Sequence, residues 1–106
     1  MDKTKTNEYS LTTQQGEDVC IYVKETMVVA QVISGKAPLR QHKTLFIRFQ
    51  DIRRIGFIGS RPDSKTFIIS SSYDDSINPI IKIDGIIHTD MTLIMEKMVD
   101  YIISRL

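Results

Sequence analysis

The sequence predicts a mainly β domain of the α+β class, in which about seven antiparallel strands are closed by one C-terminal helix. Short apolar runs, several of them alternating apolar and polar residues as half-buried strands do, are separated by turn-forming residues. The one long stretch with helical periodicity is Thr89–Arg105, at the end of the chain. The expected order is therefore a meander of strands followed by a helix.

The first three strands are expected before the first long loop. Tyr9–Thr13 is a weak first strand that ends at the turn Gln14–Glu17, where a glycine supplies backbone freedom. Apolar residues occupy every second position of Val19–Val23, and Met27–Ile33 is rich in β-branched residues, so these two segments are expected to form a hairpin. The loop Ser34–Lys43, marked by a glycine and a proline, follows.

Four more strands are expected after this loop. The alternation is clearest in the first of them, Leu45–Gln50. Leu45, Ile47 and Phe49 form one face of this strand, and Phe46 and Arg48 point to the other. A tight corner at Asp51 and a polar hairpin loop separate this strand from its successors. The four expected strands are Leu45–Gln50, Ile52–Ile58, Thr66–Ser71 and Pro79–Asp84.

The helix is expected over Thr89–Arg105, with Thr89 or Asp90 as its N-cap. Its apolar stripe would pack on a sheet or plug the end of a barrel. Leu93 and Ile103 fall outside this stripe and are either ordinary exposed apolar residues or contacts for a partner. The stripe consists of Met91, Ile94, Met95, Met98, Val99, Ile102 and Leu106.

Length and composition indicate one domain over residues 9–106, preceded by a flexible tail at residues 1–8. The single cysteine, Cys20, cannot form an internal disulfide, and its apolar neighbours predict a buried, inert thiol. No secretory signal and no apolar stretch of about 20 residues is visible, so we expect a cytoplasmic protein without a transmembrane segment.

Charge is distributed unevenly along the chain. Between Lys36 and Lys65 there are eight basic and two acidic side chains, although the net charge of the whole chain is +1. This basic segment is either an anion-binding patch or a set of loop and edge charges that pair with the acidic remainder. The candidates for anion binding are Lys36, Arg40, Lys43, Arg61 and Lys65.

No residue pattern predicts catalysis, a metal or a cofactor. Asp84, His88 and Asp90 could in principle offer three ligands, but their spacing matches no defined metal motif and each has a structural role as strand end, lead-in or cap. No phosphate-binding loop and no nucleophile–base pair occurs at a recognisable spacing. We therefore expect a protein that is not an enzyme.

With seven strands and a terminal helix in place, the chain resembles the pleckstrin-homology-like superfold, especially small bacterial PH-like and GRAM-like domains. The most specific local piece is the passage Leu45–Ile55, which looks like a strand, a polar-Asp-Ile corner and the next strand of those domains. The resemblance implies a partly open barrel or sandwich closed by the helix. PH domains that bind phosphoinositides carry basic residues in their first loop, whereas Gln14–Asp18 is acidic here, so headgroup binding at that site is not expected.

The leading hypothesis is a non-enzymatic interaction module that binds a protein partner or a second copy of itself through a sheet edge, a loop or the outer helix face. Candidate partner contacts are Leu93, Ile103, Phe46 and Arg48. The alternative is an anion-recognising module whose basic residues 36–65 contact a membrane surface or nucleic acid.

Overall fold

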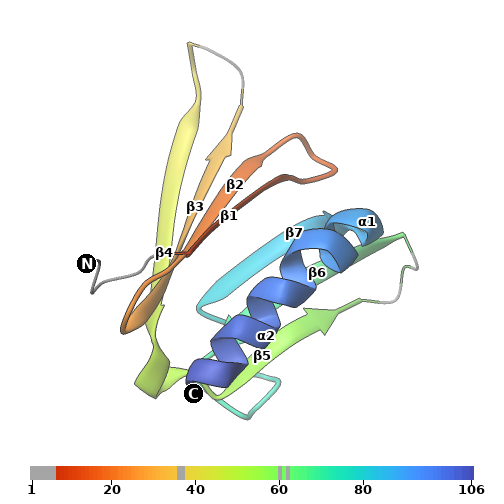
Figure 1. Ribbon diagram of the computed structural model, residues 1–106. Helices are drawn as coiled ribbons and strands as arrows, with labels where there is room; N and C mark the ends of the chain where they lie inside the picture. Colours follow the sequence, from red (N-terminus) through yellow and green to blue (C-terminus); the bar gives the residue numbers. More distant parts are fainter. Residues whose placement is uncertain (1–6, 36–37, 60, 62) are drawn as a thin grey trace.

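The computed structural model describes residues 7–35, 38–59, 61 and 63–106, apart from the side chains of Asp90 and Met91. Within them, seven antiparallel strands form two sheets and the chain ends in a helix (Figure 1). The four-stranded sheet has the order β1-β2-β3-β4 and the three-stranded sheet the order β5-β6-β7. This arrangement confirms the predicted mainly β domain with one C-terminal helix.

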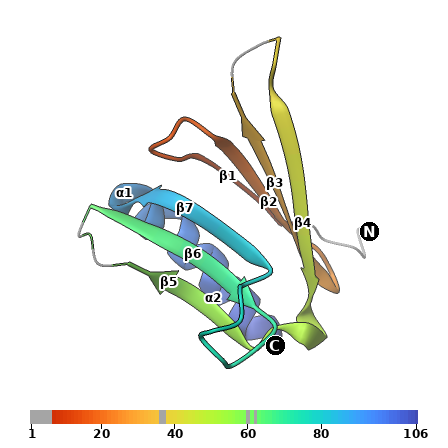
Figure 2. The same cartoon turned by 180° about the vertical axis from the view of Figure 1, so that it is seen from behind.

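The four-stranded sheet comprises β1 (Asn7–Thr12), β2 (Asp18–Val23), β3 (Met27–Ser34) and β4 (Gln41–Arg48). The short 3₁₀ helix η1 (Phe49–Asp51) joins β4 to the second sheet, which comprises β5 (Arg54–Ile58), β6 (Ser64–Ser70) and β7 (Ile81–Ile87). The terminal helix consists of α1 (His88–Asp90), a π-helical segment η2 (Met91–Met95) and α2 (Glu96–Arg105). Figures 1 and 2, seen from opposite sides, place this helix across one face of the β5-β6-β7 sheet.

The core lies between the inner faces of the two sheets and the helix. Every second residue of β2 is buried, as alternation along the strand requires. Met95, Met98 and Ile102, which lie one or two turns apart on the helix, fill the same interior. Each fully buried aliphatic side chain contributes about 1.5–3 kcal/mol of transfer free energy. The fully buried large side chains include Ile21, Phe67, Ile69, Ile81, Ile86, Met95, Met98 and Ile102.

Several strand boundaries differ from the predicted ones. β1 begins at Asn7, two residues earlier than expected, and β4 begins at Gln41, inside the segment predicted as a loop. The polar residues at the start of β4 are strand because their backbones pair with β3, where Ser34 lies opposite Gln41. Ladder hydrogen bonds thus outweigh composition in this exposed edge strand.

The helix begins earlier than its predicted N-cap. β7 continues to Ile87, the helix follows directly at His88, and the His88 N–H is bonded to the Asp63 carbonyl. Thr89 therefore lies within the first helical turn and does not cap it. At the other end Leu106, predicted to lie on the buried stripe, is exposed because it follows the last helical residue and extends past the core.

Cys20 also differs from its predicted environment. It is half-buried, because the inward positions of β2 are Val19, Ile21 and Val23 and the thiol therefore belongs to the outer face. There its Sγ lies 3.5 Å from Oγ of Ser10 on β1. The prediction of a buried thiol was wrong because neighbours in sequence lie on opposite faces of a strand.

Candidate functional site

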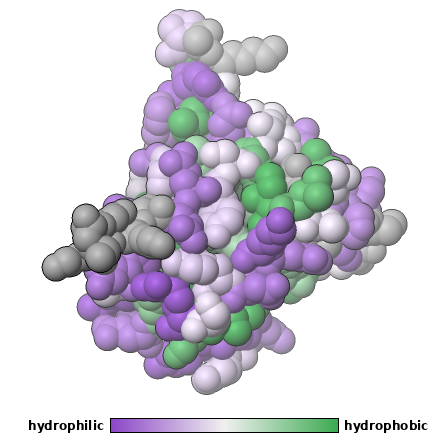
Figure 3. All heavy atoms as spheres, in the orientation of Figure 1, coloured by the Kyte–Doolittle hydropathy of each residue, from purple (hydrophilic) through white to green (hydrophobic). Residues whose placement is uncertain are grey.

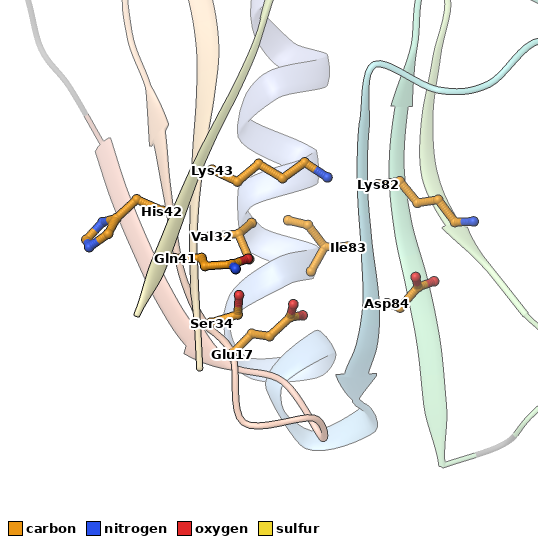
Figure 4. A pocket seen from close by; sticks show the side chains of 9 residues that line it. All are labelled: Glu17, Val32, Ser34, Gln41, His42, Lys43, Lys82, Ile83 and Asp84. Atoms are coloured by element: carbon orange, nitrogen blue, oxygen red, sulfur yellow. The ribbon is translucent and has the colours of Figure 1, made fainter. Parts of the chain in front are cut away.

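The edge strands β4 and β7 flank a seam where the two sheets are not joined by a ladder in the described part of the chain. A cavity of about 220 Å³ lies at one end of this seam (Figure 4). Val32 and Ile83 give it an apolar floor, and the side chains of Lys43 and Glu17 project into it from the four-stranded sheet. The complete lining is Glu17, Val32, Ser34, Gln41, His42, Lys43, Lys82, Ile83 and Asp84.

A second, more apolar groove of about 560 Å³ lies further along β4. Its walls come from the last residues of β4 and from the segment that enters β7. Two large apolar side chains remain exposed there, Phe46 at 60% and Ile80 at 41%. The lining is Phe46, Ile47, Arg48, Asp51, Ser71 and Ile80. Since β4 contributes to both hollows, they are two parts of one seam between the sheets.

On the side of β4 that faces the seam, no backbone group of the described residues pairs with it. In an antiparallel ladder, successive residues turn their N–H and C=O groups alternately toward the partner strand and away from it. The Phe49 N–H donates to the Thr26 carbonyl at 3.0 Å, so the odd-numbered residues of β4 bond to β3. The N–H and C=O groups directed away from β3 are therefore those of His42, Thr44, Phe46 and Arg48.

The charges around the seam differ in their availability. In the described residues neither Lys43 nor Glu17 forms an ion pair. Lys82 and Asp84 line the rim but point away from the cavity (Figure 4), and Asp84 accepts a 2.8 Å hydrogen bond from the Thr66 hydroxyl. Among the described residues that line the cavity, the charged groups that project into it are thus the ammonium of Lys43 and the carboxylate of Glu17.

Arg48 and Phe46, predicted as partner contacts, both line the apolar groove. Nε of Arg48 donates to Oδ2 of Asp51 at 3.2 Å, and both side chains are substantially exposed. An exposed pair of this kind contributes little to folding, but it holds the guanidinium beside the groove. At the corner after β4, the carboxylate of Asp51 therefore accepts from a side chain, whereas the sequence predicted that it would accept from backbone amides.

The predicted anion-binding residues do not converge on one place. Arg40 forms a 2.7 Å ion pair with Asp18, and Lys43 projects into the seam. Lys65 donates to the Gly59 carbonyl in the β5–β6 hairpin, where the exposed Arg61 also lies. Figures 1 and 2 show this hairpin and the β3–β4 loop at separate ends of the molecule. Lys36 lies outside the described residues.

The pairing of Arg40 has an electrostatic consequence for Asp18. The hydrogen bond from Arg40, followed by one from the Thr12 hydroxyl at 3.2 Å, lowers the pKa of Asp18 from its usual 3.8. Both contacts favour the ionised carboxylate. Arg40 is therefore engaged at the sheet surface by a partner that is charged at neutral pH.

The two predicted contacts on the helix are exposed, Leu93 at 63% and Ile103 at 51%. Figure 3 shows apolar side chains in separate groups over the start and the end of the helix. Exposed charged residues, Glu96, Lys97 and Asp100, lie between these ends. In its described part, the outer helix face therefore offers apolar side chains in two separate places, with charged residues between them.

No grouping of three or more metal-ligating side chains occurs among the described residues, which do not include the side chain of Asp90. Every buried polar side-chain atom in the described part has a hydrogen-bond partner. No described helix is long and apolar enough to cross a bilayer.

No protein-family model matches this chain, and comparisons with curated proteins and with solved structures found no significant match.

The sequence indicated the exposed residues on the β4 side of the seam but not the one on the β7 side. Phe46 and Arg48 were recognisable because strict alternation placed them opposite the core face. Ile80 was counted as an ordinary strand residue, and only its exposure beside Phe46 reveals its position. The signal available in the sequence was its neighbour Pro79. Proline has no N–H to donate to a strand ladder, and Ile80 accordingly lies just before Ile81, the first residue of β7.

Proposed function

We propose that this protein is a non-enzymatic interaction module that binds an extended segment of a partner protein along the free edge of β4. The observation that carries the proposal is the edge of β4, with which no described strand pairs, beside an apolar groove lined by Phe46 and Ile80. A bound strand would satisfy the outward N–H and C=O groups, while the groove would accept an apolar side chain. This mode of recognition derives affinity from main-chain hydrogen bonds and specificity from side-chain pockets.

The order of four strands, three strands and a helix supports the further proposal that the chain is a PH-like domain, a superfold that serves several kinds of binding. A cytoplasmic location is supported by Cys20, a free and partly exposed thiol that suits a reducing compartment. Anion recognition by the basic segment has less support, because Arg40 is paired with Asp18 and because Lys43 belongs to β4 in one sheet whereas Arg61 lies between β5 and β6 of the other.

The edge of β4 can be tested by removing one outward N–H group. Thr44→Pro deletes a donor directed at the seam, and it leaves the ladder to β3 intact because Thr44 does not bond to that strand. Thr44→Ala retains the N–H and is the matched control. Decapeptides selected from a random display library on the unmodified protein serve as ligands, with affinities measured by fluorescence polarisation.

The selected peptides are expected to bind Thr44→Pro about tenfold more weakly, because a peptide carbonyl loses its donor, and to bind Thr44→Ala unchanged. Amide hydrogen exchange of Thr44 and Phe46 should slow when peptide is bound. Equal affinity for the proline variant, together with unchanged exchange at these amides, would show that β4 is not the binding edge.

A further inference from the structure

We infer that the segment recognised at the β4 edge carries an acidic residue three positions after an apolar one, the acidic side chain meeting Lys43 and the apolar one meeting Phe46 and Ile80. The inference rests on the proposed function, which supplies the bound strand, and it adds the charge and spacing of the partner. The spacing follows from the positions of Lys43, Phe46 and Ile80 along the seam.

The two contact points lie on opposite faces of β4. Phe46 belongs to the outer, exposed face, and Lys43 projects between the sheets (Figure 4). Side chains directly opposite each other in an antiparallel pair lie on the same face of the sheet. A strand added to β4 therefore places the neighbour of Phe46 outward, against the apolar groove, and the neighbour of Lys43 inward, into the cavity.

Chain direction determines the order of the two residues. An antiparallel segment runs opposite to β4, so it meets Phe46 first and Lys43 three residues later. Three residues of strand span about 10 Å, and an odd separation gives the required change of face. The residue of the added strand opposite Phe46 would exchange backbone hydrogen bonds with it. The residue opposite Lys43 would not, and in such non-hydrogen-bonded pairs the two facing side chains lie closest together.

Charge complementarity selects the acidic residue. The ammonium of Lys43 forms no ion pair with any described carboxylate, and the carboxylate of Asp84 on the opposite rim points away and is bonded to Thr66. The carboxylate of Glu17 projects into the same cavity but lies on the far side of β3 from the free edge. A carboxylate on the bound strand would therefore be the direct cross-strand neighbour of Lys43.

A second copy of this chain does not meet these requirements through the same edge. The segment Gln41–Arg48 contains no carboxylate, and it carries Lys43 and Arg48. Pairing two β4 edges would bring basic strands together and leave both Lys43 side chains without a counter-charge.

Elsewhere in this chain an aliphatic residue precedes an acidic one by three positions at Ile81–Asp84, Ile87–Asp90 and Leu93–Glu96. In the first Ile81 is fully buried in the core, and the other two lie partly or wholly in the helix, so none is available as an extended strand. The occupant that fits is therefore a segment of a different protein, with an apolar residue and a carboxylate three positions toward its C-terminus.

Selection from a random decapeptide display library, using the intact protein as bait, tests the spacing. Enriched peptides should share the apolar-x-x-acidic pattern. One such peptide and its acid→Lys counterpart are then measured by fluorescence polarisation on the unmodified protein, on Lys43→Glu and on Lys97→Glu. The last variant makes the same charge change at an exposed lysine of α2 that lines neither the cavity nor the apolar groove.

The unmodified protein and Lys97→Glu should prefer the acidic peptide by about three- to tenfold, as cross-strand charge pairs do, and Lys43→Glu should prefer its lysine counterpart. Circular dichroism checks that all three proteins are folded. Unchanged preference in Lys43→Glu, or enriched peptides without an acidic residue at that spacing, overturns the inference while leaving binding at the edge intact. Binding that is also indifferent to Thr44→Pro overturns the proposed function itself.

Discussion

The guanidinium of Arg105 lies over the ring of Phe49, 5.5 Å from the ring centroid, and links the last turn of the helix to the corner between the two sheets. The same guanidinium lies 5.6 Å from the ring centroid of Tyr101 and donates a 2.8 Å hydrogen bond to the Glu25 carbonyl in the β2–β3 turn. One side chain thus connects three elements that are distant in sequence. The contact fixes the C-terminal end of the helix against the first sheet.

Arg105→Ala is expected to destabilise the domain by about 1–2 kcal/mol, because it removes a cation–π contact and a charged hydrogen bond. Urea unfolding followed by circular dichroism measures the loss. Arg105→Lys retains the charge without the planar group, so its free energy of unfolding should lie between those of the unmodified protein and Arg105→Ala. A double-mutant cycle with Phe49→Leu should give a coupling of about 0.5–1 kcal/mol, and strict additivity would contradict the stacking contact.

Gly85 joins β7 to the β1–β2 turn. Its carbonyl accepts a 3.0 Å hydrogen bond from the Gln14 N–H, its φ is +75°, and a Cβ at this position would lie 2.2 Å from Oε1 of Gln15. Gly85→Ala should therefore cost about 1–2 kcal/mol for the left-handed backbone and a further amount for displacing Gln15.

Gly16→Ala is the matched control for this glycine, since its φ is +83° and a Cβ there would meet nothing within 4 Å. The excess cost of Gly85→Ala over Gly16→Ala measures the contact with Gln15. Adding Gln15→Ala to Gly85→Ala should remove that excess in thermal and urea unfolding. If the excess persisted in the double variant, the contact between Gln15 and Gly85 would not be its cause.

The two faces of the helix should respond differently to the same substitution. Met98→Asp places a carboxylate in the core, where Met98 is fully buried, and is expected to prevent folding. Leu93→Asp changes a side chain that is 63% exposed and should alter the free energy of unfolding by no more than about 0.5 kcal/mol. Circular dichroism and thermal unfolding distinguish the two, and loss of folding in Leu93→Asp would place Leu93 in the core.

Because Asp18 forms an ion pair with Arg40, the free energy of unfolding should depend on pH in the acidic range. Because the pKa of Asp18 is lower in the folded protein than its usual 3.8, the ionised pair stabilises the fold above pH 3.8 and this contribution is lost as the pH falls through the folded-state pKa. Titration of the Asp18 carboxyl carbon by NMR measures the shift directly. Arg40→Ala should raise this pKa toward 3.8, and Thr12→Val should raise it by less; a pKa unaffected by Arg40→Ala would exclude the pair as its cause.

Alternation along strands was the most reliable guide to this fold. It placed Ile47 inside and Phe46 and Arg48 outside before any strand pairing was known, because each residue's face follows from the local backbone. The prediction for Cys20 failed because it was based on the apolar neighbours in sequence and not on the alternation of β2, which places Cys20 on the face opposite Val19 and Ile21. The prediction of a loop at Gln41 failed as well, because a polar segment becomes strand only when a neighbouring strand pairs with it.

The class of the domain, the order of its seven strands and helix, and the buried face of the helix with Met95, Met98 and Ile102 all follow from the amino-acid sequence alone. These are properties of local periodicity, which depends on residues a few positions apart. The position of β4 as an edge strand, and of Ile80 across the seam from it, depends on how the two sheets pack in three dimensions. Contacts of this kind depend on which strands meet in space, because two edges far apart in sequence carry no periodic signal of their approach.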